Sequence, residues 1–315
     1  MIKGTYIFYE DGKEIYRQPN VITKFGKRFL TNVIAGNADS HKRDIAIGIG
    51  SNSATENDTR LQFEWYRLPV LFGSTDIQTD QNTGDTTYSV IYKATLPQNI
   101  DGQIKEIGLY PVERQSLNQF EDRFLSDFSD AIAWYDDQGF SPSSTYNTDS
   151  VTYSKIGSSV INFDSGAEYY TNLFLDLSGY SSNDSITIAY YKYDTHASLI
   201  KVKFYSSDTA YYEISLTPDS GTGHKISSEI LLSSLFTNGV NDPDATKIFK
   251  IGIESIPSSG QSTVIGMDGL RVNDKDTFDP IYGIISRSVL TDAITKYAGR
   301  QLDVEYKVDM SYANN

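Results

Sequence analysis

The chain has 315 residues, the size of two ordinary domains. It carries 41 acidic residues against 27 lysines and arginines, and the formal net charge of −14 argues against nucleic-acid binding because no broad positive field can face phosphate groups. It contains no cysteine, which excludes disulfides, thiolate metal sites and cysteine nucleophiles. The apolar run at the start is too short for a signal peptide and no run is long enough to span a membrane, so we expect synthesis in a cytosol and no membrane insertion.

The first third of the chain predicts a β-rich unit with one helix. Glu10-Asp11-Gly12 separates two strand-like runs and indicates a hairpin. Phe25, Phe29 and Val33 recur at every fourth position and Gly36 follows, which predicts a helix with one apolar face. Further strands are expected at residues 45–50, 68–78, 86–95 and 103–110.

The composition changes near residue 115. From Phe120 to Val272 the chain is rich in Ser, Asp and Tyr and breaks into short strand-like runs. In Ile200–Phe204 apolar residues alternate with two lysines, which is the period of a half-buried antiparallel strand. A series of such strands predicts an all-β sandwich. After Asp279-Pro280 the earlier character returns, with strands expected at residues 281–289 and 302–310.

We therefore predict a mainly β fold in two parts. Residues 1–115 and 279–315 are expected to form a small β-rich (α+β) domain, and residues 116–278 an inserted antiparallel β-sandwich of the jelly-roll type. Such an insertion costs little when the two ends of the inserted domain lie close together, as paired first and last strands allow.

The outer segments carry an ordered set of short motifs. In chain order they are Asn20-Val-Ile-Thr23 with Gly26, Gly48-Ile-Gly50, Asp58-Thr-Arg-Leu61 followed by Glu64-Trp-Tyr-Arg67, Glu106-Ile-Gly108-Leu109, and Lys296 with Gly299, Leu302, Val304 and Tyr306. This set resembles a group of bacteriophage virion proteins found in tails, baseplates and fibres. In that family the last two motifs usually follow each other directly, whereas here a long segment separates them.

The inserted segment resembles the jelly roll of carbohydrate-binding modules. The resembling features are Phe120-Glu-Asp-Arg-Phe124, Leu175-Asp-Leu-Ser178, Ser185-Ile-Thr-Ile-Ala-Tyr-Tyr191 and Met267-Asp-Gly-Leu-Arg-Val272. This resemblance lies in the pattern of the segment, and a fold analogy does not by itself assign a function.

Together the resemblances imply a structural component of a bacteriophage virion, associated with the tail, baseplate or fibre and made in the host cytoplasm. The implied partners are other virion proteins and further copies of the chain, in a trimer or hexamer. The sandwich would project outward and bind host or environmental glycans. Two alternatives stay open: a head or neck decoration protein without a ligand, and a free carbohydrate-binding or carbohydrate-degrading protein.

No enzymatic activity is expected. The three histidines are scattered in polar segments, and the chain has no His-rich zinc motif, no Gly-x-Ser-x-Gly motif and no P-loop. Asp136-Asp137 is a paired carboxylate, but such pairs are common in a chain with 41 acids, and a glycosidase needs two carboxylates set across a cleft.

Carbohydrate binding would use aromatic rings for stacking, together with polar partners. The inserted segment supplies Trp134, Tyr135, Tyr146, Tyr169, Tyr170, Tyr190, Tyr191, Tyr193, Tyr205, Tyr211 and Tyr212. Consecutive tyrosines on a strand point to opposite faces, so one of each pair should lie in the core. We predict Trp134, Tyr135 and Tyr193 as the surface candidates; the alternative is that they are packing aromatics.

Calcium is the one metal candidate, and no other cofactor is implied. Jelly rolls of the resembling type bring a carboxylate of the opening strand beside an aspartate of the closing strand, which here selects Glu121, Asp122 and Asp268. Backbone carbonyls would complete the six to eight oxygen ligands that Ca²⁺ prefers. The alternative is that Asp268 forms a turn before Gly269.

A third group of candidate residues is ionic. Glu64 and Arg67 stand three positions apart beside Asp58. The family resemblance implies an ion pair that fastens this loop to the core or to a neighbouring subunit. The alternative is an ordinary solvated pair, which contributes under about 1 kcal/mol.

Overall fold

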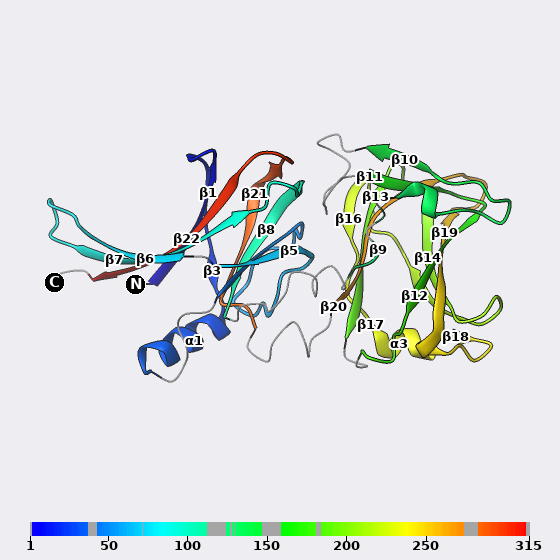
Figure 1. Ribbon diagram of the computed structural model, residues 1–315, viewed down its shortest axis with the longest axis horizontal. Helices are drawn as coiled ribbons and strands as arrows, with labels where there is room; N and C mark the ends of the chain where they lie inside the picture. The colour runs from blue at the N-terminus through cyan, green and yellow to red at the C-terminus, as the bar shows by residue number, and fades with distance from the viewer. Residues whose placement is uncertain are drawn as a thin grey trace. The chain divides into compact units, whose positions relative to one another are not determined.

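In the computed structural model the described residues are 2–36, 43–70, 72–111, 124–126, 128, 130–146, 159–180, 184–273 and 283–312. The chain divides into two compact units, Met1–Glu121 with Asp279–Asn315, and Asp122–Phe278 (Figure 1). We call them the discontinuous unit and the sandwich unit. The predicted fold class is confirmed, because both units are built mainly of antiparallel sheets.

The discontinuous unit contains two five-stranded sheets. Sheet A has the order β2 (Lys13–Pro19), β1 (Ile2–Glu10), β22 (Leu302–Tyr312), β7 (Thr86–Leu96) and β6 (Phe72–Thr79). Sheet B has the order β3 (Val21–Ile22), β21 (Ser286–Lys296), β8 (Gly102–Tyr110), β4 (Asp44–Gly48) and β5 (Glu64–Pro69). Each sheet therefore receives one interior strand, β22 or β21, from the C-terminal segment, which joins the two ends of the chain into one unit.

The predicted helix is present as α1 (Lys24–Ile34). Thr23 caps its start, since the Thr23 hydroxyl accepts a hydrogen bond of 2.9 Å from the amide of Gly26. Phe25 and Phe29 stack with ring centroids 6.1 Å apart, as the four-residue spacing predicts. Within the described part of the chain, no helix is long and apolar enough to cross a membrane.

The sandwich unit pairs sheet C with sheet D. Sheet C has the order β10 (Ser143–Tyr146), β11 (Ser159–Asp164), β20 (Val264–Asn273), β13 (Ser185–Lys192) and β16 (Gly223–Ile226), with β9 (Phe124–Ser126) beside β20 and β17 (Ile230–Leu231) beside β13. Sheet D has the order β12 (Glu168–Leu175), β19 (Ile248–Pro257), β14 (Ala197–Tyr205), β15 (Tyr211–Leu216) and β18 (Gly239–Val240). A short helix, α3 (Leu232–Thr237), and two 3-10 turns, η1 (Ala131–Ala133) and η2 (Ala245–Lys247), complete the unit.

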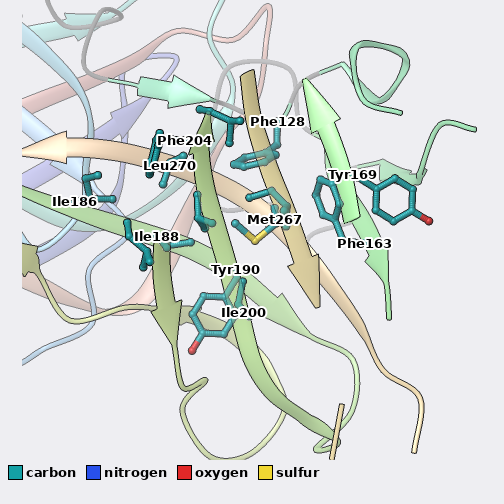
Figure 2. Packing of buried hydrophobic residues seen from close by; sticks show 14 of the residues in the cluster. Phe128, Phe163, Tyr169, Ile186, Ile188, Tyr190, Ile200, Phe204, Met267 and Leu270 are labelled. Carbon is teal, nitrogen blue, oxygen red and sulfur yellow. The ribbon is translucent and has the colours of Figure 1, made fainter. Parts of the chain in front are cut away.

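The core of the sandwich lies between the inner faces of these sheets (Figure 2). Ile200, Val202 and Phe204 of β14 are buried there, and the lysines between them lie on the opposite face, so the predicted two-residue period is confirmed. Consecutive tyrosines also divide as predicted: the core takes Tyr190 from β13, while Tyr191 stays partly exposed. Removing this apolar surface from water supplies the main driving force for folding of the unit.

Candidate binding face of the sandwich

Trp134 is not a surface residue. Its side chain is 2% exposed and packs between Phe128 and Phe163, with ring centroids 5.3 and 5.1 Å away. The prediction that Trp134 binds carbohydrate at the surface is therefore wrong. The physical reason is that a large apolar ring contributes most when it fills the core, and here it joins an aromatic cluster with Phe128 and Phe163.

Tyr135 and Tyr193 reach the surface but belong to different faces. Tyr135 forms a β-bridge with Tyr170 of β12, and its hydroxyl donates to Asn172 at 3.0 Å, which places it beside sheet D. Tyr193 follows β13 of sheet C, and its hydroxyl donates to Asn162 of β11 at 2.8 Å. The three predicted aromatic residues thus do not form one site.

Of the three calcium candidates, Glu121 and Asp122 lie outside the described residues. Asp268 is buried inside β20, at a bulge opposite Ala189 and Tyr190, so the alternative of a turn before Gly269 is wrong. Its carboxylate lies 3.2 Å from Nε2 of His224. Among the described residues no group of three or more His, Cys, Asp or Glu side chains is arranged to hold a metal. The calcium site stays a prediction.

Glu64 and Arg67 form a two-pronged ion pair, with both nitrogen–oxygen distances at 2.6 Å. Both side chains are at most 4% exposed, so the alternative of a solvated pair is wrong. The Arg67 guanidinium also lies over the ring of Tyr110, 3.9 Å from its centroid. Asp58 does not join this pair, because its carboxylate instead accepts a hydrogen bond of 2.9 Å from Arg287.

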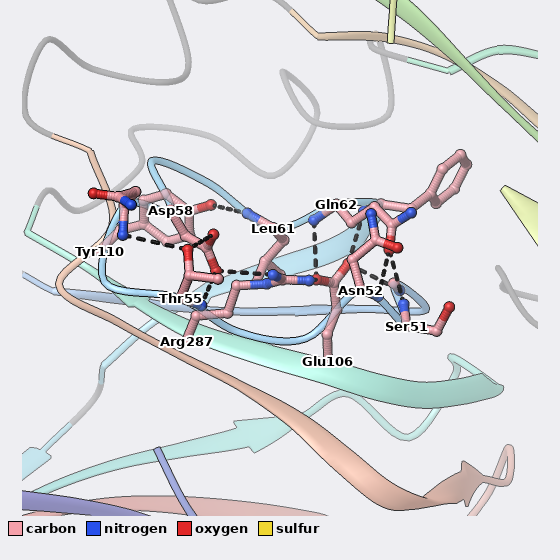
Figure 3. Close-up of polar contacts among 12 residues, drawn as sticks. Ser51, Asn52, Thr55, Asp58, Leu61, Gln62, Glu106, Tyr110 and Arg287 are labelled. Carbon is pink, nitrogen blue, oxygen red and sulfur yellow. Dashed lines mark hydrogen bonds and ion pairs between the residues drawn. The ribbon is translucent and has the colours of Figure 1, made fainter. Parts of the chain in front are cut away.

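Arg287 and Glu106 are the centre of a polar network that sequence reasoning missed as a site (Figure 3). The fully buried carboxylate of Glu106 accepts two hydrogen bonds from Arg287, at 2.8 and 3.0 Å. It also accepts the backbone amides of Gly50, Gln62 and Phe63, at 2.7–2.9 Å. A side chain at Gly50 would clash with this carboxylate, which explains the second glycine of the Gly48-Ile-Gly50 motif.

The charges of this network hold it together. Burial alone would raise the pKa of Asp58, but hydrogen bonds from Arg287 and Thr55 outweigh it and lower the pKa. Burial likewise opposes the charge of Arg287, yet Glu106 and Asp58 raise its pKa. Because Glu106 and Arg287 are shielded from solvent and pair with each other, the network is a structural frame of the discontinuous unit.

A different cluster covers the outward face of sheet D. Alternation along β12, β14, β15 and β19 places tyrosines, lysines and glutamates together on this side. We define the tyrosine face as Glu168, Tyr170, Lys203, Tyr205, Tyr211, Lys250 and Glu254.

Three rings of this face lie side by side. The ring of Tyr205 is 5.9 Å from that of Tyr170 and 5.0 Å from that of Tyr211. The ammonium group of Lys250 lies 4.5 Å from the ring centroids of both Tyr170 and Tyr205. A side chain at Gly252 would clash with Glu168 and press on the Tyr205 ring, so the glycine leaves the room that these groups occupy.

Glu168 organises the polar part of the face. It accepts a hydrogen bond of 2.6 Å from the hydroxyl of Tyr205 and one of 2.7 Å from Lys203, which also donates to Glu254 at 3.1 Å. Burial and the bond to Glu168 raise the pKa of Tyr205. Burial alone would lower the pKa of Lys203, but Glu168 and Glu254 have the larger combined effect, so its pKa is raised overall. At neutral pH the phenol of Tyr205 therefore stays protonated and the ammonium of Lys203 stays charged, and both side chains are largely buried within the face.

The same face continues into more open residues along β12. Asn172 follows Tyr170 at the next outward position and is exposed. Phe174 comes next in the alternation and is 84% exposed. A rigid sheet that combines an exposed ring with neighbouring amide, phenol and charged groups can stack on the apolar side of a sugar and bond its hydroxyls. The alternation along Glu168–Leu175 in the sequence is the signal that marks Phe174, which is not among the predicted surface aromatics.

No protein-family model matches the chain, and no curated protein matches it. Among solved structures, it is similar to an exo-β-agarase at 12% identity, over 48% of this chain and 24% of that one, with a TM-score of 0.36. It is similar to a family 11 carbohydrate-binding module from Clostridium thermocellum, in complex with a mixed-linked tetrasaccharide, at 16% identity over 48% and 94%, with a TM-score of 0.33. A tailspike enzymatic domain of bacteriophage CBA120 aligns at 11% identity over 48% and 21%, with a TM-score of 0.28.

The chain spans only about a quarter of the length of the agarase. At these identities the similarities carry no residue role over to this chain.

Proposed function

We propose that the protein is a non-enzymatic structural component of a bacteriophage particle, associated with the tail, baseplate or fibre, and that its sandwich unit binds a glycan. The particle role is supported by the way the motif residues of the outer segments meet. Asn20 of the first motif donates to the hydroxyl of Tyr306 of the last motif at 2.9 Å, and Glu106 accepts the amide of Gly50, also at 2.9 Å. Motifs far apart in the chain therefore meet in one unit, which supports the resemblance that they carry.

The tyrosine face with Phe174 is the single observation that carries the glycan-binding half. Its side chains come from neighbouring strands of one sheet, so they are held in position before a ligand arrives. Its aromatic, amide and charged groups match the apolar and hydroxyl-bearing sides of a sugar. On a symmetric particle, many copies of a weak site would add up to useful avidity.

The absence of enzymatic activity is also a proposal. Glu168 and Glu254 are two carboxylates on one face, as a glycosidase would need. Lys203, however, bonds both of them and offsets their charge. A glycosidase needs one carboxyl group that stays protonated to act as an acid, and a lysine between the two works against that state.

Binding of the full chain to arrays of bacterial surface polysaccharides tests this function. We expect binding by the wild type and at least roughly fivefold weaker binding by Phe174→Ala, since an aromatic contact contributes about 1 kcal/mol beyond its area. Phe140→Ala is the matched control, because Phe140 is also exposed, at 66%, but lies outside the tyrosine face. Equal loss in both variants would contradict this choice of site.

Two further outcomes separate the alternatives. A wild type that binds no glycan on any array would favour a decoration protein without a ligand. Release of shortened sugars from a bound polysaccharide would overturn the proposal that the protein is not an enzyme, and loss of that release in Glu168→Gln would then identify Glu168 as one of the catalytic carboxyl groups.

A further inference from the structure

Sheet A carries a row of exposed apolar side chains that crosses four strands. Ile2 of β1 pairs with Met310 of β22, Met310 pairs with Tyr88 of β7, and Tyr88 pairs with Ile77 of β6. Directly paired residues of antiparallel strands project to the same side of a sheet. Ile2, Tyr88 and Ile77 are 46%, 43% and 64% exposed, so this row meets solvent.

The exposed row is the continuation of a buried one. Two rows further along the same face, Tyr6 and Tyr306 are paired, are at most 1% exposed, and contact each other as tilted rings with centroids 4.7 Å apart. Gly4 and Val308 form the row between the exposed row and the Tyr6–Tyr306 row, and both are buried. The face is therefore covered at one end and open at the other, and an open apolar face of this kind marks an interaction surface.

A groove adjoins the exposed row at its Ile2 end. It has a volume of about 720 Å³ and is formed by β1, β3, α1 and their neighbouring segments. Its lining includes the apolar residues Ile2, Val21, Ile22 and Leu30, together with the ion pair of Lys27 with Glu56. Ile2 belongs to both the row and the groove, so the two form one continuous apolar surface.

The two ends of this surface carry opposite charge. Residues 73–92, which contain most of the β6–β7 hairpin, hold three aspartates, Asp76, Asp80 and Asp85, and no lysine or arginine. Helix α1, beside the groove, holds Lys24, Lys27 and Arg28 and no acidic residue. A surface that is acidic and apolar at one end and basic and hollowed at the other is complementary to a second copy of itself.

We propose that the chain associates with itself through this surface: the β6–β7 hairpin of one copy, led by Ile77 and Tyr88, docks on the groove beside α1 of another. The apolar side chains enter the groove, and Asp80 and Asp85 of the turn between β6 and β7 face the basic residues of the helix. This contact lies in the discontinuous unit and does not depend on glycan binding by the sandwich.

Cysteine pairing tests the contact directly, because the natural chain has no cysteine to interfere. Ile77→Cys chains are mixed with Leu30→Cys chains under mild oxidation, so that any disulfide between the two variants joins two molecules. We expect the mixed disulfide to form readily. Ile132→Cys is the matched control partner for Leu30→Cys, since Ile132 is 85% exposed and lies in the sandwich unit. Equal yields in the two mixtures would overturn the proposal.

Sedimentation equilibrium of the full chain provides the second readout. We expect the wild type to form a closed assembly and Ile77→Ser with Tyr88→Ser to associate at least roughly tenfold more weakly, because these residues supply the exposed apolar contact. Ile132→Ser should leave association unchanged. A wild type with the mass of one chain at every concentration that stays in solution would overturn the proposal, as would association that survives the double substitution unchanged.

Discussion

Arg287 donates two hydrogen bonds to Glu106, a residue 181 positions earlier in the chain, and both side chains are buried. This pair connects β21 of the C-terminal segment to β8 of the N-terminal segment. It also fixes the loop that carries Gln62 and Phe63, since their amides bond the same carboxylate. The closure of the discontinuous unit therefore depends on a polar contact that spans the inserted sandwich in sequence.

Glu106→Gln should strongly destabilise the discontinuous unit. The substitution leaves Arg287 charged and buried without its main counter-charge, and breaking a buried pair in this way costs about 3–5 kcal/mol. Chemical denaturation monitored by circular dichroism measures the loss. Glu56→Gln is the control, because Glu56 pairs with Lys27 at the surface and should change stability little. Similar stability of the two variants would show that Glu106 is not a central support.

Gly252→Ala should weaken both the stability and the glycan binding of the sandwich. Even one methyl group there would clash with Glu168 and displace the Tyr205 ring. Gly179→Ala is the matched control, since no atom lies within 4 Å of the position that its Cβ would take. Thermal unfolding and the glycan array report the two effects. If Gly252→Ala binds glycan as well as Gly179→Ala does, the tyrosine face is not the binding surface.

Stability should fall in alkaline solution. Burial raises the pKa of Tyr190 to about 12 and that of Tyr306 to about 12, from 10.0 for an ordinary tyrosine. A raised pKa means that the folded state holds its proton longer, so the stability from these groups is complete below pH 10 and is lost as the pH rises through about 12. Tyrosinate absorbance should show a late-titrating group, and Tyr306→Phe should reduce it. A single titration near pH 10 in the folded protein would contradict the burial of both hydroxyls.

Tryptophan fluorescence should not respond to glycan binding. The chain has two tryptophans, and Trp65 and Trp134 are each 2% exposed. We expect an emission maximum at short wavelength and little quenching by acrylamide in the native state. A large change on addition of a bound glycan would contradict a binding surface that leaves both buried tryptophans untouched.

Local sequence patterns predict individual helices and strands better than they predict which segments contact each other. The spacing of Phe25 and Phe29 predicted α1, and the alternation in Ile200–Phe204 predicted β14, because each depends on neighbours within a few positions. The strand expected at 68–78 is instead split, with β5 ending at Pro69 and β6 beginning at Phe72. Proline lacks an amide hydrogen and commonly ends a sheet ladder.

The candidate site was harder to predict because it depends on long-range contacts. Nothing near Trp134 in sequence shows that Phe163 packs on it. Asp58 was grouped with its near neighbours, but its partner Arg287 lies 229 positions away. The tyrosine face draws its residues from several strands, and their common side appears only when the register between strands is known.

The most direct test of the proposed function is the position of the protein in an intact particle. Antibodies against the full chain, coupled to gold, would be applied to purified phage and viewed by electron microscopy. We expect labels at fixed, symmetric positions on the tail, baseplate or fibre. Unlabelled particles, with the protein found free in the lysate, would contradict a structural role in the virion.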